Sequence, residues 1–211
     1  MFDRVLPGNT SALLALLGQH KAIQEAYLAG GTALALQLGH RYSFDLDFFT
    51  PTPFDEKELI NTIQSIGPFK LETLKWRTIL GKFTDVKFSI FYYEYPLLFT
   101  PHQYNGIRIA DAKDIAAMKI AAVADRGTKR DFIDLYIIAK NIVSLEEAID
   151  LYEKKYHNLT QAAIHIHRAL SYFDDAEQDD TPKMIERIKW PEVRAFFEQE
   201  AKKLARKLIN K

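Results

Sequence analysis

The sequence of 211 residues contains no cysteine. Disulfide scaffolds, thiolate metal sites and cysteine nucleophiles are therefore excluded. Net charge is also absent, because 28 basic residues balance 28 acidic ones. The chain then has no global field that attracts a polyanion, and nucleic acid would have to bind a local basic cluster. Two segments are basic enough to form such a cluster, residues 125–131 and the amphipathic tail 202–211.

The chain also lacks an apolar run of about 18 residues, so we expect no transmembrane helix and no membrane partner. Its first ten residues lack the basic and apolar regions of a secretory signal. Together with the absence of cysteine, this predicts a cytoplasmic protein. Hydrophobic residues make up 47% of the chain and charged residues 27%, which is ordinary for a folded protein. The length allows one large domain or two small ones.

Helix and strand patterns alternate in the first half of the chain. Apolar residues recur at helical spacing in three segments, 11–26, 32–38 and 55–66. Period-two alternation predicts three strands, 42–50, 71–80 and 82–93. Thr32 is expected to begin the second helix and Gly39 to end it. Gly81 is expected to form the turn between the last two strands.

From Asp111 onward the pattern changes to long helical segments without a strand signal. The expected helices are 111–127, 130–141, 144–156, 160–173 and a final helix that follows Trp190-Pro191. Residues 174–182 are acidic and end in proline, which predicts a linker. This order of elements, strand-rich and then all-helical, indicates an α+β fold with a C-terminal helical bundle. We expect two domains, 1–110 and 111–211.

Asp45 and Asp47 stand two residues apart in the strand expected over 42–50. Alternation places both on one face, with Leu46 and Phe48 on the other. Two adjacent carboxylates repel each other, so a cation must compensate them if they are even partly buried. Mg²⁺ suits this role, because it prefers hard oxygen ligands and retains water. The pattern therefore predicts a magnesium site, although a solvated strand face has the same spacing.

A glycine pair precedes these acids in the chain. Gly30 and Gly31 allow the backbone to approach a ligand closely. Thr32 then opens a helix whose free N–H groups can hold phosphate. Each of these elements alone is a weak signal of function. The combination of a phosphate-binding turn, a helix and a strand with metal ligands is a more specific one. The combination indicates phosphoryl transfer, in which bound metal assists the attacking and leaving oxygens.

Residues 25–140 resemble the AbiEii/AbiGii toxin family of the DNA polymerase β-like nucleotidyltransferase superfamily. Part of the resemblance lies in the Gly-Gly turn and the Asp-x-Asp of "LAGGTALALQLGHRYSFDLDFF". The rest lies in Lys119 after an apolar stretch and in Asp131 and Asp134 of "RDFIDLY". The family supplies the toxins of type IV toxin–antitoxin and phage-defence modules. The last 70 residues match it only in being helical.

The resemblance implies a small mixed sheet of the nucleotidyltransferase type with flanking helices, followed by the C-terminal helical bundle. It also implies a nucleotide-binding cleft and a defined chemistry. The enzyme would transfer NMP from an NTP to an acceptor, an RNA or tRNA end, with Mg²⁺ as cofactor and a separate cognate antitoxin as partner. Asp45 and Asp47 would hold the metal. The implied catalytic residues are Asp45, Asp47, Lys119, Asp131 and Asp134. The implied nucleotide-binding residues are Gly30, Gly31, Thr32, Ser43, Lys87, Arg126 and Arg130.

One position departs from the family pattern. Where the family has Lys-x-Asp, this chain has Lys87-Phe88-Ser89. Ser89 brings no charge and is a poor ligand for Mg²⁺, while Asp85 lies about 13 Å away along an extended strand. Either one metal suffices, or the nucleotide supplies the missing oxygens, or the chain is a catalytically degenerate protein that binds nucleotide or regulates.

The helical half also has simpler interpretations. Asp131 could cap a helix, and Asp134 could pair with a nearby Lys or Arg. Lys119 could be a lysine whose stem covers apolar surface. Arg126 and Arg130 could be ordinary surface arginines. These alternatives stand beside the catalytic assignments.

Overall fold

The computed structural model describes residues 1–157 and 162–209. The chain divides into two compact units, Met1–Asp111 and Ala112–Lys211. Within the described residues, every strand lies in the first unit and the second is helical. The α+β fold expected from the sequence is therefore confirmed. No helix in these two ranges is long and apolar enough to cross a membrane.

The first unit is built on a mixed sheet that has seven strands among the described residues. In sheet order they are β3 (Phe69–Lys75), β4 (Thr78–Phe83), β5 (Val86–Tyr92), β2 (Leu46–Thr50), β1 (Tyr27–Leu28), β7 (Ile107–Ile109) and β6 (His102–Tyr104). Strand β2 runs parallel to β5 and antiparallel to β1, and β1 runs parallel to β7. The other neighbours are antiparallel.

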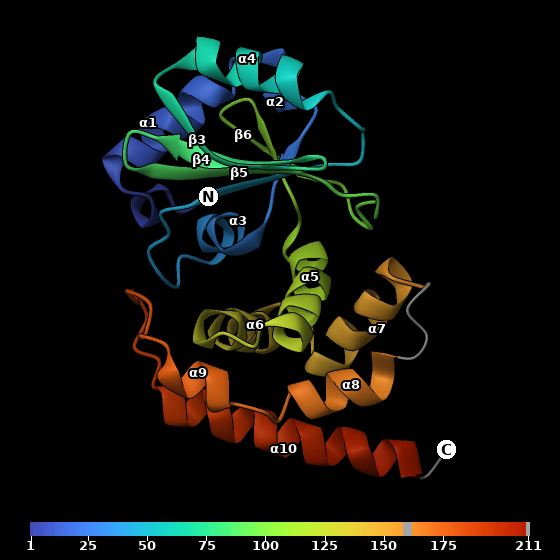
Figure 1. Cartoon of the computed structure of the whole chain (residues 1–211). Helices are drawn as coiled ribbons and strands as arrows, with labels where there is room; N and C mark the ends of the chain where they lie inside the picture. The colour runs from blue at the N-terminus through green and yellow to red at the C-terminus, as the bar shows by residue number, and fades with distance from the viewer. Residues whose placement is uncertain (158–161, 210–211) are drawn as a thin grey trace. The chain divides into compact units, whose positions relative to one another are not determined.

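Helices cover both faces of this sheet. They are the short 3-10 helix η1 (Asp3–Val5), α1 (Gly8–Leu17), α2 (Lys21–Gln24), α3 (Gly30–Leu38) and α4 (Glu56–Ile66). Helix α4 lies on one face and α3 on the other (Figure 1). Leu59 of α4 and Ile90 of β5 line a common pocket, so the side chains that share a face with Ile90 point toward α4. Phe48 and Phe88 belong to that face and are at most 1% exposed.

The segment 71–93 forms parts of three strands rather than two, which corrects the sequence prediction. Its turns lie at residues 76–77 and 84–85, where Arg77 and Thr84 adopt φ angles of 50° and 51°. Gly81 lies inside β4, where an added Cβ would be 2.4 Å from the carbonyl oxygen of Lys70. Gly81 therefore permits the close approach of β3 and forms no turn.

The helix expected over 11–26 is also divided. It ends after Leu17, and α2 follows separately. Gly18 packs so closely on the β6–β7 turn that a Cβ would be 1.9 Å from the carbonyl oxygen of Asn105. The side-chain amide of Gln24 donates to the carbonyl oxygen of Gly18 at 2.8 Å. A continuous helix would use the carbonyl oxygen of Gly18 for a backbone hydrogen bond. Here that oxygen accepts from the side chain of Gln24 instead.

Two boundaries near the predicted site also shift. Helix α3 begins at Gly30, so Thr32 lies in its first turn instead of opening it. It ends as expected at Gly39, which has a φ of 71°. The strand predicted over 42–50 begins only at Leu46.

The described part of the second unit consists of helices packed on aromatic residues. They are α5 (Ala112–Asp125), α6 (Lys129–Asn141), α7 (Leu145–Lys155), α8 (Ala162–Ala169), α9 (Asp174–Gln178) and α10 (Trp190–Ile209). The ring of Phe132 lies 5.1 Å from those of Phe173 and Phe197. The predicted linker 174–182 instead begins with α9, whose acidic first turn favours a helix start. Of the helix predicted over 160–173, residues 160 and 161 lie outside the described residues.

Candidate functional site

Asp45 and Asp47 lie on the same side of the chain at the beginning of β2. Asp47 is the second residue of the strand, and Asp45 immediately precedes it. Both are half-buried, whereas Leu46 and Phe48 are completely buried. The burial pattern thus has the expected alternation, and the two acids lie on the face opposite to α4.

The carboxylate of Asp47 lies against the glycine turn. Gly30 has a φ of +66°, and a Cβ added to it would be 3.4 Å from Oδ2 of Asp47. The backbone N–H of Ala29 also donates to the carbonyl oxygen of Asp47, at 3.0 Å. Helix α3 begins at this point without a side-chain cap. Its first N–H groups have no partner within the helix, so a carboxylate and a helix N-terminus lie together.

Ser89 is the neighbour of Asp47 on the other side. The two residues are in register between the parallel strands β2 and β5. Ser89 is 7% exposed, and its hydroxyl group donates to Oδ1 of Asp47. Asp85 is exposed in the β4–β5 turn. The position thus supplies a hydrogen bond that orients Asp47, in place of a third carboxylate.

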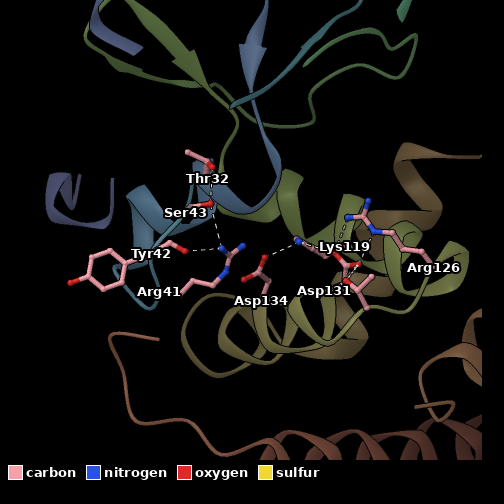
Figure 2. Close-up of polar contacts among 9 residues, drawn as sticks. Thr32, Arg41, Tyr42, Ser43, Lys119, Arg126, Asp131 and Asp134 are labelled. Carbon is pink, nitrogen blue, oxygen red and sulfur yellow. Dashed lines mark hydrogen bonds and ion pairs between the residues drawn. The ribbon is translucent and has the colours of Figure 1, made fainter. Parts of the chain in front are cut away.

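A group of buried polar side chains holds the segment before β2. The hydroxyl of Thr32 donates to the carbonyl oxygen of Asp45 and lies 2.7 Å from Oγ of Ser43 (Figure 2). Nη1 of Arg41 donates to Oγ of Ser43 at 3.3 Å and to the carbonyl oxygen of Tyr42 at 3.1 Å. The side chains of Thr32 and Ser43 therefore fix the backbone that carries Asp45.

Lys87 occupies a different environment from these buried groups. It is exposed on β5, two residues before Ser89. Alternation places both on the same face. Of the predicted nucleotide-binding side chains in the first unit, Lys87 is the one that projects from the sheet surface.

In the second unit, Lys119 lies between two buried aspartates (Figure 2). Its Nζ is 2.9 Å from Oδ1 of Asp131 and 2.7 Å from Oδ2 of Asp134. Lys119 is 5% exposed, and both acids are fully buried. The interpretation of Lys119 as a lysine that covers apolar surface is therefore wrong. The ion pair considered for Asp134 is present.

Asp131 has two further partners at the start of α6. Nε of Arg126 lies 2.8 Å from its Oδ2, and the hydroxyl of Thr128 donates to the same oxygen at 2.6 Å. Burial raises the pKa of Asp131, but Lys119, Arg126 and Thr128 together outweigh burial and hold that pKa well below its usual range. The cap of α6 is Thr128, not Asp131. Asp131 is therefore ionised at neutral pH, and its carboxylate holds Lys119, Arg126 and Thr128 in place.

The two arginines differ in their surroundings. The side chain of Arg126 is 61% exposed although its Nε is fixed on Asp131. Arg130 is exposed in the first turn of α6. The aspartate cluster therefore carries one cation that is buried, Lys119, and one that reaches solvent, Arg126.

Acidification should destabilise the second unit through Asp131. Because its pKa is lower in the folded state, the stabilisation is complete above the unfolded-state pKa of about 3.9 and is lost as the pH falls below it. Denaturant titrations between about pH 6 and pH 3 should show this loss. Asp131→Asn should flatten the dependence, whereas Asp150→Asn, which changes an exposed residue of α7, should leave it as in the wild type. An equal dependence in all three proteins would contradict the assignment.

The acids of the first unit suit a metal that arrives with its substrate. Residues 1–157 and 162–209 contain no group of three or more His, Asp or Glu side chains that could hold a metal ion. Two carboxylates such as Asp45 and Asp47 nevertheless fit Mg²⁺, which commonly takes one or two carboxylates and completes its shell with water and substrate phosphates. The donor set thus fits a substrate-dependent site better than a permanent one.

The fold that carries these residues is that of a nucleotidyltransferase. MenT4, a nucleotidyltransferase toxin from Mycobacterium tuberculosis H37Rv, matches with a TM-score of 0.63 and 19% identity over 92% of this chain and 80% of that one. JHP933 from Helicobacter pylori matches with a TM-score of 0.58 and 22% identity over 96% of this chain and 93% of that one. Identities this low establish the fold alone.

Sequence comparison identifies the family. The model of the nucleotidyl transferase AbiEii toxin of type IV toxin–antitoxin systems matches residues 11–209. An uncharacterized protein of Aquifex aeolicus (strain VF5) is 41% identical over 188 residues, which cover 83% of this chain and 86% of the relative. The chain belongs to the AbiEii nucleotidyltransferase toxin family. The resemblance seen in the motifs is confirmed, and the match extends into the last 70 residues.

Two residues of the polar clusters were not among the predicted site residues. Thr128 stands three residues before Asp131, a spacing typical of a helix start, and this signal could have identified it. Arg41 is 4% exposed and contacts Ser43. An arginine beside a strand gives no signal of burial in a single sequence, so Arg41 could be found only from the fold.

Proposed function

We propose that this chain transfers NMP from an NTP to an RNA end, with the tRNA acceptor end as the leading candidate. It would act in the cytoplasm as the toxin of a toxin–antitoxin or phage-defence pair, and its antitoxin would be a separate protein. Family membership supports the transferase class. The observation that carries the proposal is the position of the Asp47 carboxylate beside Gly30, where a Cβ added to the glycine would be 3.4 Å from Oδ2, at the start of α3.

The first unit would bind the triphosphate and the metal. Asp45 and Asp47 would hold Mg²⁺, which when bound polarises a phosphoryl oxygen and offsets developing charge. The N–H groups of Gly31 and Thr32 lie in the first turn of α3, where phosphate oxygens are favoured. Ser89 would keep Oδ1 of Asp47 in place, so that Oδ2 faces the glycine turn. Lys87 would approach the phosphates from the exposed face of β5.

We also assign roles to two cations and two acids of the second unit. Lys119 and Arg126 would offset negative charge in the transition state. Asp131 would hold both of them, because its carboxylate bonds to each. Asp134 is the acid we propose for orienting the acceptor hydroxyl. Arg130, which is exposed in the first turn of α6, would add a further cation that phosphate can reach from solvent.

A transfer assay tests the proposal directly. The protein is incubated with total tRNA, Mg²⁺ and each labelled NTP in turn, with and without EDTA. We expect label in tRNA from a preferred NTP and none with EDTA. Thermal melting with each Mg²⁺–NTP pair provides a second measurement. Absence of both transfer and stabilisation with all four nucleotides would refute nucleotide binding and transfer together.

Ser89 favours a second candidate function, a degenerate nucleotidyltransferase that binds nucleotide without transferring it. The hydrogen bond from Ser89 to Asp47 leads us to expect activity in the native chain. Ser89→Asp would set a like charge beside Asp47, so we expect it to lower transfer. Ser89→Thr keeps the hydroxyl and should retain most of the rate. Transfer that appears only in Ser89→Asp would establish the degenerate alternative.

A further inference from the structure

Positive charge in the first unit is concentrated in one part of the sheet. Residues 70–87, which run from β3 into β5, contain two acids, Glu72 and Asp85, and therefore carry a net charge of +3 from five basic residues, Lys70, Lys75, Arg77, Lys82 and Lys87. The rest of residues 1–111 contains five basic and nine acidic residues, a net charge of −4. The balanced charge of the whole chain thus conceals a local basic surface.

Three of these lysines lie side by side across three strands. Lys70 of β3 is directly opposite Lys82 of β4, and Lys82 is directly opposite Lys87 of β5. Opposed residues of antiparallel strands point to the same face. We call Lys70, Lys82 and Lys87 the lysine row. Because Lys87 is two residues from Ser89, the row shares the face of Ser89 and Asp47.

The acidic side chains near the lysine row are too few to neutralise its three positive charges. Like charges that are directly opposite in a sheet destabilise it. Glu72 lies 2.8 Å from Nζ of Lys82, and the pKa of Glu72 is lowered by that hydrogen bond and by the charges of Lys82, Lys70 and Lys87. Asp85 attracts Lys82 as well. Lys70 and Lys87 are exposed, so the row presents its charge to solvent.

We infer that the lysine row binds the phosphate backbone of the RNA acceptor. The inference rests on the proposed function and adds the path of the RNA, from the Asp45 and Asp47 end of β2 across β5 and β4 to the edge strand β3. Neighbouring strands are about 4.8 Å apart, so the row extends over about 10 Å. Lysines set at such intervals neutralise successive phosphates without reading sequence.

Lys87 lies on β5 beside β2, where it would also approach the nucleotide phosphates, whereas Lys70 and Lys82 lie farther from the nucleotide on β3 and β4. The glycine turn follows β1, which lies beside β2, whereas the row lies on β5, β4 and β3 on the other side of β2. A triphosphate at the start of α3 would therefore occupy the opposite side of Asp47. Lys70 and Lys82 are left for a second, longer polyanion, and the RNA acceptor is the polyanion that the reaction requires.

The test measures binding of a short fluorescent single-stranded RNA by anisotropy over a range of salt concentrations. The variant Lys70→Gln/Lys82→Gln is compared with Lys21→Gln/Lys57→Gln, which removes two exposed lysines of α2 and α4. Each lost phosphate contact lowers the salt slope by about 0.7, so two contacts reduce the affinity roughly 25-fold at about 0.1 M salt. The control pair should bind as the wild type does. An equal loss in both pairs would overturn the inference.

A variant that is expected to strengthen RNA binding serves as a control for misfolding, because a misfolded protein would not bind RNA more tightly. Glu72→Gln frees Lys82 from its ion pair and should tighten RNA binding, whereas unchanged or weaker binding would count against the row. Mg²⁺–NTP stabilisation of the Lys70→Gln/Lys82→Gln variant should equal that of the wild type. If nucleotide stabilises the wild type but the double variant binds RNA normally, the row is refuted while the proposed function stands. If no NTP stabilises the wild type and none is transferred, the proposed function itself is refuted.

Discussion

Asp47→Asn should lower nucleotide transfer by roughly three orders of magnitude while the fold is retained. Asparagine has the shape of aspartate, and its amide oxygen can still accept the hydrogen bond that Ser89 donates to Asp47. The substitution removes the negative charge that, under the proposed function, would hold Mg²⁺ beside the glycine turn. Initial rates of label transfer measure the effect, and thermal melting without ligand checks that the fold is intact.

The matched control for this substitution is Asp85→Asn. Asp85 is also an acid of the β-sheet region, but it is exposed in the β4–β5 turn, so its loss should leave the transfer rate near that of the wild type. Titration with Mg²⁺ gives an independent measurement, because a lost metal ligand raises the Mg²⁺ concentration required for half-maximal rate. Transfer by Asp47→Asn at the wild-type rate would exclude Asp47 as a metal ligand.

Lys119→Met should destabilise the second unit by about 3–5 kcal/mol. The substitution removes the cation that lies 2.7 Å from Asp134 and 2.9 Å from Asp131, both of which are completely buried. A buried carboxylate whose neighbouring cation is lost retains the cost of its desolvation. Chemical denaturation, followed by a signal from the second unit such as Trp190 fluorescence, measures the change.

Two further variants separate stability from chemistry. Lys119→Met/Asp134→Asn removes one of the two buried negative charges and should recover much of the stability without recovering transfer. Lys155→Met breaks the pair of Lys155 with Asp114, which is equally buried and 2.9 Å long. It should cost similar stability, yet the folded fraction should transfer nucleotide normally. Full transfer in the Lys119→Met/Asp134→Asn protein would show that Lys119 acts through stability alone.

In the first unit, the features that depend on short stretches of sequence could be predicted, because each has a pattern of its own in the chain. Period-two burial of Leu46 and Phe48 identified the face of Asp45 and Asp47. The pairing of Asp47 with Ser89 depends on the parallel register of β2 and β5, which lie about 40 residues apart in the chain. No local pattern encodes that register. The turn at 76–77 was missed because a non-glycine residue, Arg77, adopts the positive φ.

In the second unit the residue types were predictable but their mutual contacts were not. An apolar run that ends in lysine and a helix that begins with spaced aspartates are visible in the sequence. Lys119 and Asp131 are twelve residues apart on different helices, so their ion pair depends on the packing of α5 on α6. The ion pair between Arg126 and Asp131 depends on the same packing, and it forms although most of the Arg126 side chain is exposed.

The place of β1 in the sheet affects how the protein can be made during translation. Strand β1 leads directly into the glycine turn, and it is flanked by β2 on one side and by β7 on the other. Residues Ile107–Ile109 of β7 pair with β1 only after the ribosome has synthesised nearly the whole first unit. A nascent chain that ends before this point leaves β1 as an open edge. The glycine turn therefore acquires its complete support late, and premature termination products would lack it.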